Sequence, residues 1–509
     1  MGDININLSP KVPSIPRTND KTKIDVRYSV IAPFVSIHIY YDPAYGEVIY
    51  EVEEPILSDM DKSNFEKIEM AMREIVNVSL LSGERTPENL IEYVDKTAKL
   101  IISELGLSVN SDSYKKIFYY LYRNFIGFNE IEAMMKDYYI EDIECNGFNQ
   151  SIYIVHRVFR NVKTSVRFND TDKLAGFVEK LAQKTGRHIS YASPILDGSL
   201  PDGSRVNATY TQDITSKGPT FTIRKFTKVP WTPIQLIGFR SLSPEMLAYF
   251  WILLQYKSNM LIVGGTASGK TTLLNAIAFF IPQESRVVSI EDTRELNLPR
   301  ENWLPSVVRT GLREDGGGGV EMFSLLRSSF RQNPDYVIVG EVRGKEASVL
   351  FQGMASGHAS ISTMHADSVE SVVRRLETPP ISLSPSLING MDAVIVMSHA
   401  IVDKHETRRL REIVEVINVK EDGSTITNTP FQWNPADDGF YSAQWSSIFE
   451  KISKKYGISL EEIHREYLFR AKLLYAMYQR KVLGYDEVQK VINDYAKNPQ
   501  EVLSRFGIS

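Results

Sequence analysis

The pattern of apolar and polar positions organises the first half of the chain. Residues 1–25 show no periodicity and are predicted to form a flexible arm. Residues 28–52 are rich in Val, Ile and Tyr around a Pro-Ala-Tyr-Gly turn, which predicts a β-hairpin. Helical spacing follows, and then short strands and turns. We therefore predict an N-terminal α/β domain over 26–224, and its division into 26–140 and 141–224 stays open.

The second half alternates short apolar runs with segments of helical spacing, beginning with an apolar run at 260–263. Further strands are predicted at 286–290, 336–339, 359–364 and 391–397. Helices are predicted between them, at 322–331, 345–356 and 368–377. This alternation is typical of a mostly parallel sheet covered by helices. An added hairpin over 410–432 and a helical appendage over 448–506 complete the predicted second domain, 235–509.

Residues 225–234, between the two predicted domains, hold Pro230 and Pro233 and show little periodicity. Prolines stiffen a connector locally and leave the flanking residues free to act as a hinge. We therefore predict that 225–234 is a short hinge linker. A run of glycines at 316–319 predicts a flexible loop within the second domain.

Composition narrows the class of protein. A chain of 509 residues with 43% hydrophobic and 24% charged residues is typical of a globular protein with two or more domains. The net charge of −5 disfavours a nucleic-acid binder, so no nucleic acid is expected as a partner. The single cysteine, Cys145, excludes an internal disulfide and a CxxC zinc cluster. No apolar run approaches the roughly 20 residues of a membrane span, and the N-terminus lacks an apolar signal segment, so we expect a cytoplasmic protein.

The apolar run at 260–263 leads into glycines and a Gly-Lys-Thr triplet. Its spacing, from Gly264 to Thr271, is that of a phosphate-binding P-loop between a strand and a helix. Backbone amides of such a loop surround phosphate oxygens, Lys270 reaches the β- and γ-phosphates, and the Thr271 hydroxyl ligates Mg²⁺. The predicted nucleotide-binding residues of the loop are Gly264, Gly265, Thr266, Ala267, Ser268, Gly269, Lys270, Thr271 and Thr272. The alternative is a Gly-rich turn without a ligand.

Carboxylates follow two of the later strands, where a γ-phosphate would need support. Cleavage of that phosphate requires Mg²⁺, a residue that orients water, and cations for the developing charge. Glu291 and Asp292 can hold Mg²⁺ through water or poise the attacking water. Glu341 stands in the layout of a Walker B motif, with Gly340 in place of the usual first acid. Glu341 is our candidate for positioning the water and for a water-mediated metal contact, and which of Glu291 and Glu341 is the general base stays open.

A histidine follows the next strand, and plainer alternatives exist for all of these side chains. His365, at a third consecutive strand end, can sense the nucleotide state through a hydrogen bond, whereas a lone histidine is more often a satisfied core group. Glu291 and Asp292 alternatively form a solvated turn of mixed charge. Glu341 alternatively pairs with Arg343.

Together these segments resemble the secretion-superfamily ATPases, which drive type II and type IV secretion, type IV pili and the archaeal flagellum. The acidic segment 290–296, the atypical Walker B segment 335–344 and the histidine segment 357–366 follow the P-loop in the order and spacing of that family. The resemblance implies a RecA-like P-loop ATPase domain that uses ATP and Mg²⁺. It also implies a homo-hexameric ring at the cytoplasmic face of a polytopic membrane protein, the platform.

The N-terminal half carries two further candidates. In this family, arginines of the N-terminal domain approach the nucleotide at a subunit junction, and Arg205 and Arg224 resemble those arginines. The resemblance implies a catalytic role for both and a nucleotide contact for Arg224. The alternative is that they are exposed arginines of β-strands.

Residues 141–147 and 431–436 resemble the archaeal branch of the family, and the lack of a four-cysteine module agrees. The N-terminal hairpin and the polar arm most resemble the archaellum motor ATPases. That likeness implies two kinds of partner, the archaellum platform and accessory cytoplasmic archaellum proteins. It also implies that the protein is peripheral at the inner face of the membrane, and it leaves lipid contact open. The alternatives are an archaeal type IV pilus or type II secretion assembly ATPase and, more distantly, a RecA-like nucleic-acid translocase. A regulatory GTPase would need an Asn-Lys-x-Asp motif, which the sequence lacks.

Overall fold

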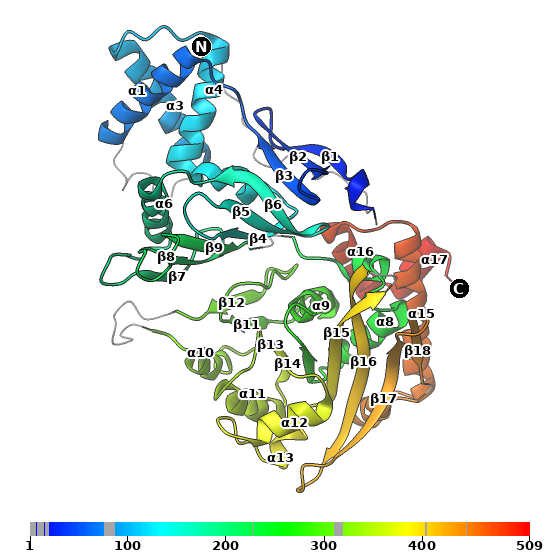
Figure 1. Cartoon of the computed structure of the whole chain (residues 1–509). Helices are drawn as coiled ribbons and strands as arrows, with labels where there is room; N and C mark the ends of the chain where they lie inside the picture. The colour runs from blue at the N-terminus through cyan, green and yellow to red at the C-terminus, as the bar shows by residue number, and fades with distance from the viewer. Residues whose placement is uncertain are drawn as a thin grey trace. The chain divides into compact units, whose positions relative to one another are not determined.

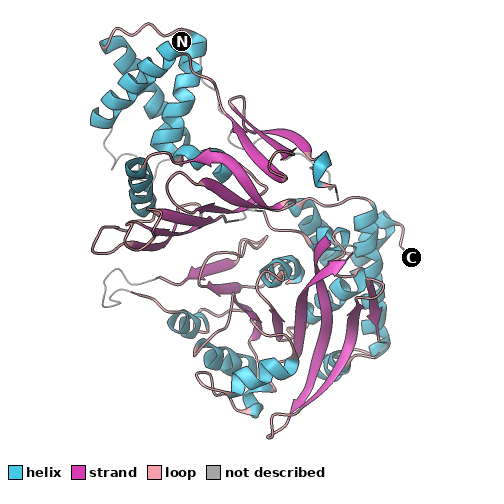
Figure 2. Ribbon diagram, in the orientation of Figure 1, coloured by secondary structure: helices cyan, strands magenta, loops and turns pink. Residues whose placement is uncertain are grey.

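The computed structural model describes residues 20–75, 87–226, 229–309, 319–402, 405–443 and 445–508, together with Asn7 and Ile15. The chain divides into two compact units, Met1–Phe226 and Thr227–Ser509. Each unit is an α/β structure built on its own nine-stranded sheet within the described residues (Figures 1 and 2). Most of the predicted arm, 1–25, and residues 316–318 of the predicted glycine loop lie outside the described residues.

The sheet of the first unit runs in the order β1-β2-β3-β6-β5-β4-β9-β8-β7. Its strands are β1 (Asp25–Ile31), β2 (Val35–Asp42), β3 (Glu47–Glu53), β4 (Ile140–Cys145), β5 (Ser151–His156), β6 (Arg160–Arg167), β7 (Ile195–Ser199), β8 (Arg205–Thr209) and β9 (Thr220–Arg224). Neighbouring strands are antiparallel except for β3 and β6. The predicted hairpin is formed by β2 and β3, and β1 adds a third strand in front of it.

Helices of the first unit bury apolar stripes in two separate cores. Its helical segments are η1 (Lys21–Lys23), α1 (Asp59–Ile75), α3 (Pro87–Glu104), α4 (Ser111–Leu121), η2 (Tyr122–Ile126), η3 (Asn129–Ile131), α5 (Glu132–Lys136) and α6 (Thr171–Lys184). Helices α1, α3 and α4 share a core that includes Ile68, Ala98 and Phe118. Helix α6 buries Phe177 and Leu181 in the core of the sheet.

The sheet of the second unit runs in the order β12-β11-β13-β14-β10-β15-β16-β17-β18. Its strands are β10 (Met260–Gly264), β11 (Val287–Glu291), β12 (Trp303–Val307), β13 (Tyr336–Val339), β14 (Ala359–Met364), β15 (Ala393–Val402), β16 (His405–Val419), β17 (Thr425–Asn434) and β18 (Gly439–Ser442). From β12 to β15 all neighbours are parallel, and β15 to β18 form an antiparallel extension. The prediction of an α/β fold with a mostly parallel sheet in this unit is confirmed.

Helices cover both faces of the parallel part of this sheet (Figure 1). They are α7 (Pro233–Gly238), α8 (Pro244–Gln255), α9 (Lys270–Ile277), η4 (Ala278–Phe280), α10 (Met322–Ser329), α11 (Glu346–Ala355), α12 (Val369–Glu377), α13 (Pro385–Ile388), α14 (Ser447–Tyr456), α15 (Leu460–Gln479), α16 (Tyr485–Lys497) and α17 (Pro499–Phe506). Met260 and Ile262 of β10 join the core of α8, α9 and the C-terminal helices. Leu261 and Val263 join the core of α11 and α12 on the opposite face. Burial of each such side chain contributes about 1.5–3 kcal/mol.

The two ends of segment 225–234 are held by different units. The Lys225 amide donates to the carbonyl of Glu141, at 2.8 Å, in the first unit. Helix α7 of the second unit begins at Pro233 behind a capping box of Thr232 and Gln235. The hinge role of this segment stays a prediction. Among the described residues, no helix combines the length and the apolar character needed to cross a bilayer.

Candidate active site

The loop between β10 and α9 has the backbone of a phosphate-binding loop. Gly269, with φ of 96°, lies in the left-handed region directly before the helix. Gly264 has no room for a side chain, because an added Cβ would lie 2.4 Å from the Met397 carbonyl oxygen and 2.5 Å from the Ser268 hydroxyl. The glycines therefore let the chain turn sharply here, and α9 then begins with Lys270, Thr271 and Thr272.

Lys270 is folded back into this loop. Its Nζ atom donates to the carbonyl oxygens of Gly264, at 3.0 Å, and Gly265, at 2.8 Å. The side chain is largely buried, and burial lowers the pKa of Lys270, while the nearby charge of Glu341 opposes that shift. The ammonium is thus held at the centre of the loop by neutral oxygens.

His365 and Glu341 extend this contact chain across two neighbouring strand ends. His365 directly follows strand β14, and its Nδ1 lies 3.4 Å from Nζ of Lys270. Glu341 follows strand β13, and its Oε1 lies 3.2 Å from Nε2 of His365. An ammonium only donates, so Nδ1 accepts and the ring proton belongs on Nε2, the nitrogen nearer to Glu341. The parallel order β13-β14-β10 brings these three side chains together at one edge of the sheet.

Glu341 has more than one cationic partner. Burial alone would raise its pKa, but Arg343, His365 and Lys270 together lower it below the usual value. Arg343 donates from NH2 to Oε2 of Glu341 at 2.6 Å, so the predicted alternative of a Glu341–Arg343 pair is present in the structure. Asp292 lies 3.9 Å from NH1 of the same arginine and is largely exposed. Glu341 is therefore an ionised carboxylate with Oε1 near His365, which contacts Lys270, and Oε2 bonded to Arg343.

Glu291, in contrast, is turned into the interior. It is 1% exposed, and its Oε1 accepts hydrogen bonds from the amides of Glu295 and Leu296, both at 2.9 Å. Oε2 has no hydrogen-bond partner among the described residues. Burial raises the pKa of Glu291 to about 7, against the lowering effect of the two amides. These contacts indicate that Glu291 holds the backbone of the loop that follows β11.

Gly340 is explained by the same glutamate. An added Cβ at Gly340 would lie 3.1 Å from Cγ of Glu291, so a larger residue would push this side chain away. The glycine that replaces the usual Walker B acid therefore makes room for Glu291. Thr363 of β14 donates its hydroxyl to the Gly340 carbonyl at 2.6 Å and fixes the strand end.

Sequence reasoning did not select two charged residues of this region, Glu295 and Arg343, for the site. The charge of Glu295 raises the pKa of Lys270, so this carboxylate contributes to the electrostatics of the loop lysine. Asn275 of α9 holds the same segment by donating to the Glu295 carbonyl at 3.1 Å. The sequence signal for Glu295 was its place in the acidic run 291–295. The loop after β11 turns back, so the last acid of this run, Glu295, comes to lie next to α9.

Arg205 and Arg224 lie in the first unit and face each other in the pairing of β8 with β9. Arg205 forms a two-pronged ion pair with Asp197, with distances of 3.1 Å from Nε and 3.0 Å from NH2. About half of the Arg205 side chain remains exposed. The two guanidinium groups therefore come from adjacent strands of one sheet, and a role beside nucleotide stays a prediction.

Comparison with known proteins adds a family to this geometry. The family model described as Type II/IV secretion system protein matches residues 131–429. The chain belongs to this family. The matched segment of this secretion-system protein spans parts of both units and includes every predicted site residue, from Arg205 to His365.

Individual relatives of this secretion-system protein cover different parts of it. It is 34% identical over 484 residues to the uncharacterized protein MJ0900 of Methanocaldococcus jannaschii. This match covers 90% of this chain and 86% of MJ0900. It is 33% identical over 227 residues to the type IV secretion system protein PtlH of Bordetella pertussis, covering 40% of this chain and 67% of PtlH. Among solved structures, the VirB11 ATPase of the Brucella suis type IV secretion system matches with 24% identity and a TM-score of 0.29, over 54% of this chain and 92% of that chain.

Proposed function

We propose that this protein is a Mg²⁺-dependent ATPase that powers assembly of an archaellum. The observation that carries the proposal is the contact chain from Lys270 through His365 to Glu341, at the ends of three adjacent parallel strands. A P-loop lysine joined to a potential water-positioning carboxylate is suited to cleavage of a γ-phosphate. A passive Gly-rich turn has no need for that chain.

Each residue has a chemical task in the proposed reaction. The loop amides and the start of α9 bind the β-phosphate, and Lys270 exchanges its carbonyl partners for phosphate oxygens. Glu341, kept ionised by its cationic neighbours, accepts a hydrogen bond from the attacking water. His365 transmits the position of Lys270 to Glu341.

The donor set fits a magnesium ion bound together with ATP. Thr271 lies in the first turn of α9 and offers its hydroxyl, and Asp292 and Glu341 offer carboxylate oxygens at neighbouring strand ends. Mg²⁺ accepts such oxygen ligands directly or through water. When bound, Mg²⁺ neutralises negative charge on the β- and γ-phosphates. Glu291 would act on this ion through the loop that it holds.

Arg205 and Arg224 complete the site in the proposed mechanism, from another domain or another subunit of a homo-hexamer. Charge-assisted hydrogen bonds from arginine to phosphate are strong, so loss of the γ-phosphate removes a strong contact. Segment 225–234 then acts as the hinge that lets the domain angle change. Nucleotide turnover becomes movement by biasing this equilibrium.

The archaellum assignment rests on the N-terminal hairpin, the polar arm and the archaeal-branch segments 141–147 and 431–436. A relative from Methanocaldococcus jannaschii that spans 90% of the chain is consistent with it. The proposed partners are a polytopic archaellum platform and accessory cytoplasmic archaellum proteins, with lipid contact at the inner face of the membrane. An archaeal type IV pilus or type II secretion assembly ATPase is the second candidate, because it shares the same motifs.

Biochemical and genetic measurements test the proposal. Purified protein should hydrolyse ATP in the presence of Mg²⁺, should form hexamers with a non-hydrolysable ATP analogue, and should be stimulated by platform protein or lipid. Stimulation by single-stranded DNA instead would favour a translocase. Deletion of the gene should abolish archaella in electron micrographs and leave pili; loss of pili alone would assign the protein to pilus assembly.

A further inference from the structure

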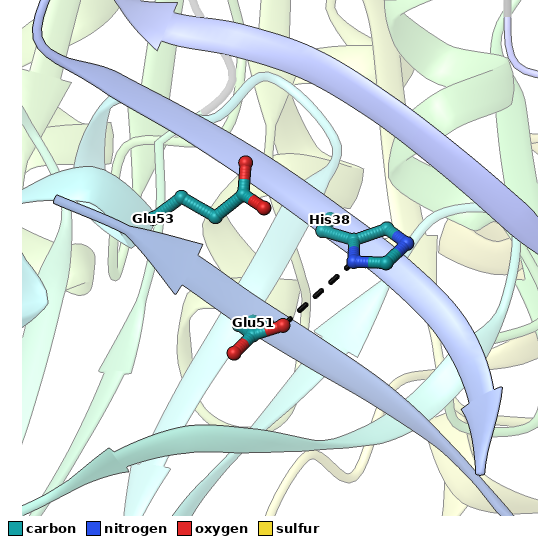
Figure 3. A group of neighbouring side chains, drawn as sticks. All are labelled: His38, Glu51 and Glu53. Atoms are coloured by element: carbon teal, nitrogen blue, oxygen red, sulfur yellow. Dashed lines mark ion pairs between the residues drawn. The ribbon is translucent and has the colours of Figure 1, made fainter.

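A cluster of polar side chains lies on β1–β3 of the first unit, at the end of its sheet opposite to β7–β9. His38 of β2 and Glu51 and Glu53 of β3 each offer a ligand atom, and these atoms all lie within 4.8 Å of one another (Figure 3). We propose that this cluster binds a divalent transition metal ion of the Zn²⁺ class. The proposal is independent of the ATPase function.

The strand pairing places these residues on one face of the sheet. His38 pairs directly with Glu51, and Ser36, two residues earlier, pairs with Glu53. Residues two apart on a strand point to the same side, so the imidazole and both carboxylates share that side. On the other flank of β2, Arg27 of β1 pairs with His38.

The distances suit a small tetrahedral ion. Nδ1 of His38 lies 3.7 Å from a carboxylate oxygen of Glu51, as the dashed line in Figure 3 marks. Metal–ligand bonds of about 2.1 Å in a tetrahedral zinc site put neighbouring ligand atoms about 3.4 Å apart. The ligand atoms of the cluster lie within 4.8 Å of one another, and the partly exposed glutamates can close the remaining gap by rotating their side chains.

The histidine is already oriented for metal binding. Its Nε2 lies 2.8 Å from Oδ1 of Asp25, and its ring packs against Tyr40 with centroids 4.6 Å apart. A hydrogen bond to Asp25 puts the ring proton on Nε2 and leaves the Nδ1 lone pair directed at the glutamates. Ligating histidines commonly use their second nitrogen in this way, as donor to a carboxylate.

A positive charge already occupies the position between these ligands. NH2 of Arg27 lies 3.1 Å from Nδ1 of His38 and 3.2 Å from Oε1 of Glu53. The Arg27 side chain is 62% exposed, so it can leave for solvent without burying its charge elsewhere. Exposed ion pairs contribute little to stability, and a divalent ion brings twice the charge of the guanidinium. The metal ion would therefore replace Arg27.

The donor set also selects the kind of metal. Imidazole together with carboxylates suits Zn²⁺ and its late first-row neighbours, whereas Mg²⁺ and Ca²⁺ prefer oxygen ligands alone. Three protein ligands leave one position of a tetrahedral ion for water. Millimolar Mg²⁺, as an ATPase assay contains, should not compete at this site.

The test is a Zn²⁺ titration of the full-length, metal-stripped protein against a chromophoric chelator in excess Mg²⁺. Wild type should bind one Zn²⁺ that His38→Ala and Glu51→Gln both lose, while the control His464→Ala, an exposed histidine of α15, keeps it. Asp25→Asn should weaken binding about 10-fold or more, as loss of an orienting carboxylate does elsewhere. Arg27→Gln should tighten binding, because the competing cation is gone.

The opposite results overturn the proposal. A wild type without a Zn²⁺ site in this titration, or Zn²⁺ binding that survives both His38→Ala and Glu51→Gln, would leave the cluster as an ion-pair network with Arg27. Weaker binding by Arg27→Gln would contradict the exchange of cations. Circular dichroism of each variant separates a lost ligand from a lost fold, and Glu51→Gln, which keeps shape and length, carries the test if His38→Ala unfolds.

Discussion

Nζ of Lys270 lies 3.4 Å from Nδ1 of His365, so the P-loop lysine and the histidine behind β14 form one contact. A phosphate that draws Lys270 away changes this contact, and His365 passes the change to Glu341. We expect His365→Gln to slow ATP turnover by roughly 10- to 100-fold, the worth of one hydrogen bond to a charged group, with little change in nucleotide affinity. Single-turnover kinetics and fluorescent-nucleotide binding measure the two quantities. The matched control is His399→Gln, an exposed histidine of β15, and equal turnover in both variants would contradict the role of His365.

Lys270 supplies the central cation of the loop, and its loss should remove both phosphate binding and chemistry. We expect Lys270→Ala to abolish ATP turnover in a coupled phosphate-release assay. The fold should survive, because the Lys270 ammonium bonds to carbonyl oxygens of its own loop and to His365, and its removal leaves no buried charge without a partner. Lys420→Ala, on the exposed turn after β16, is the control. Unchanged turnover of Lys270→Ala would mean that another site carries out the reaction.

Glu341 lies at the end of the Lys270–His365 chain, and Arg343, His365 and Lys270 together hold its pKa below the usual value. Glutamine keeps the shape and removes the negative charge, so Glu341→Gln should bind ATP with near-normal affinity and lose hydrolysis by roughly 10²- to 10⁴-fold. The measurement is equilibrium binding followed by single-turnover hydrolysis of the same preparation. A variant that hydrolyses ATP at the wild-type rate would transfer the water-positioning role to another carboxylate, for which Glu295, whose charge raises the pKa of Lys270, is a candidate.

The pattern of short segments between turns predicted several sheet elements well. The strands β13 and β14 have the predicted bounds. Tyr336–Val339 is a continuous apolar run, and Ala359–Met364 is a short segment between Gly357-His358 and His365, so both are too short for a helix of ordinary length. Strand β12 was not predicted, since Trp303–Val307 carries Pro305 and only partial apolar character. The structure explains this, because β12 is the edge strand of its sheet, where proline is tolerated and one side needs no partner.

For the candidate site, the sequence located the strand ends but not the direction of each side chain. Lys270, Glu341 and His365 meet as expected from the parallel strand order. Glu291 and Asp292 are neighbours in sequence, yet Glu291 points into the core and Asp292 into solvent, because adjacent residues at a strand end face opposite sides. The inward direction of Glu291 depends on Gly340 of another strand, a relationship that no local pattern contains.

Arg205 and Arg224 provide a separate test of the proposed shared site. Arg205→Ala and Arg224→Ala should each slow hydrolysis by roughly 10- to 100-fold if a charge-assisted contact to phosphate is lost. Thermal stability should change little, because exposed ion pairs such as Arg205–Asp197 contribute about 0–1 kcal/mol. Steady-state turnover and melting curves measure both effects, with Arg187→Ala as the control. Turnover equal to that of wild type would remove these arginines from the site.

Glu291 makes the stability of the second unit depend on pH. Its pKa is raised from 4.5 to about 7 in the folded protein, chiefly by burial. Between those values the folded state keeps a proton that the unfolded state has released, so stability is full below about pH 4.5 and falls as pH rises to about 7. A shift of this size corresponds to at most about 3 kcal/mol. Above pH 7 the contribution of Glu291 is constant.

Glu291→Gln should remove that fall, because an amide stays neutral and its oxygen can still accept the hydrogen bonds from Glu295 and Leu296. The free energy of unfolding can be measured by denaturant titration, followed by the fluorescence of tryptophans in the second unit. Between pH 5 and pH 8 the wild type should lose stability relative to Glu291→Gln. Glu301→Gln, at an exposed position before β12, should show no such shift. Parallel pH profiles for wild type and Glu291→Gln would mean that Glu291 is already ionised at pH 5, and that the two amides outweigh the cost of its burial.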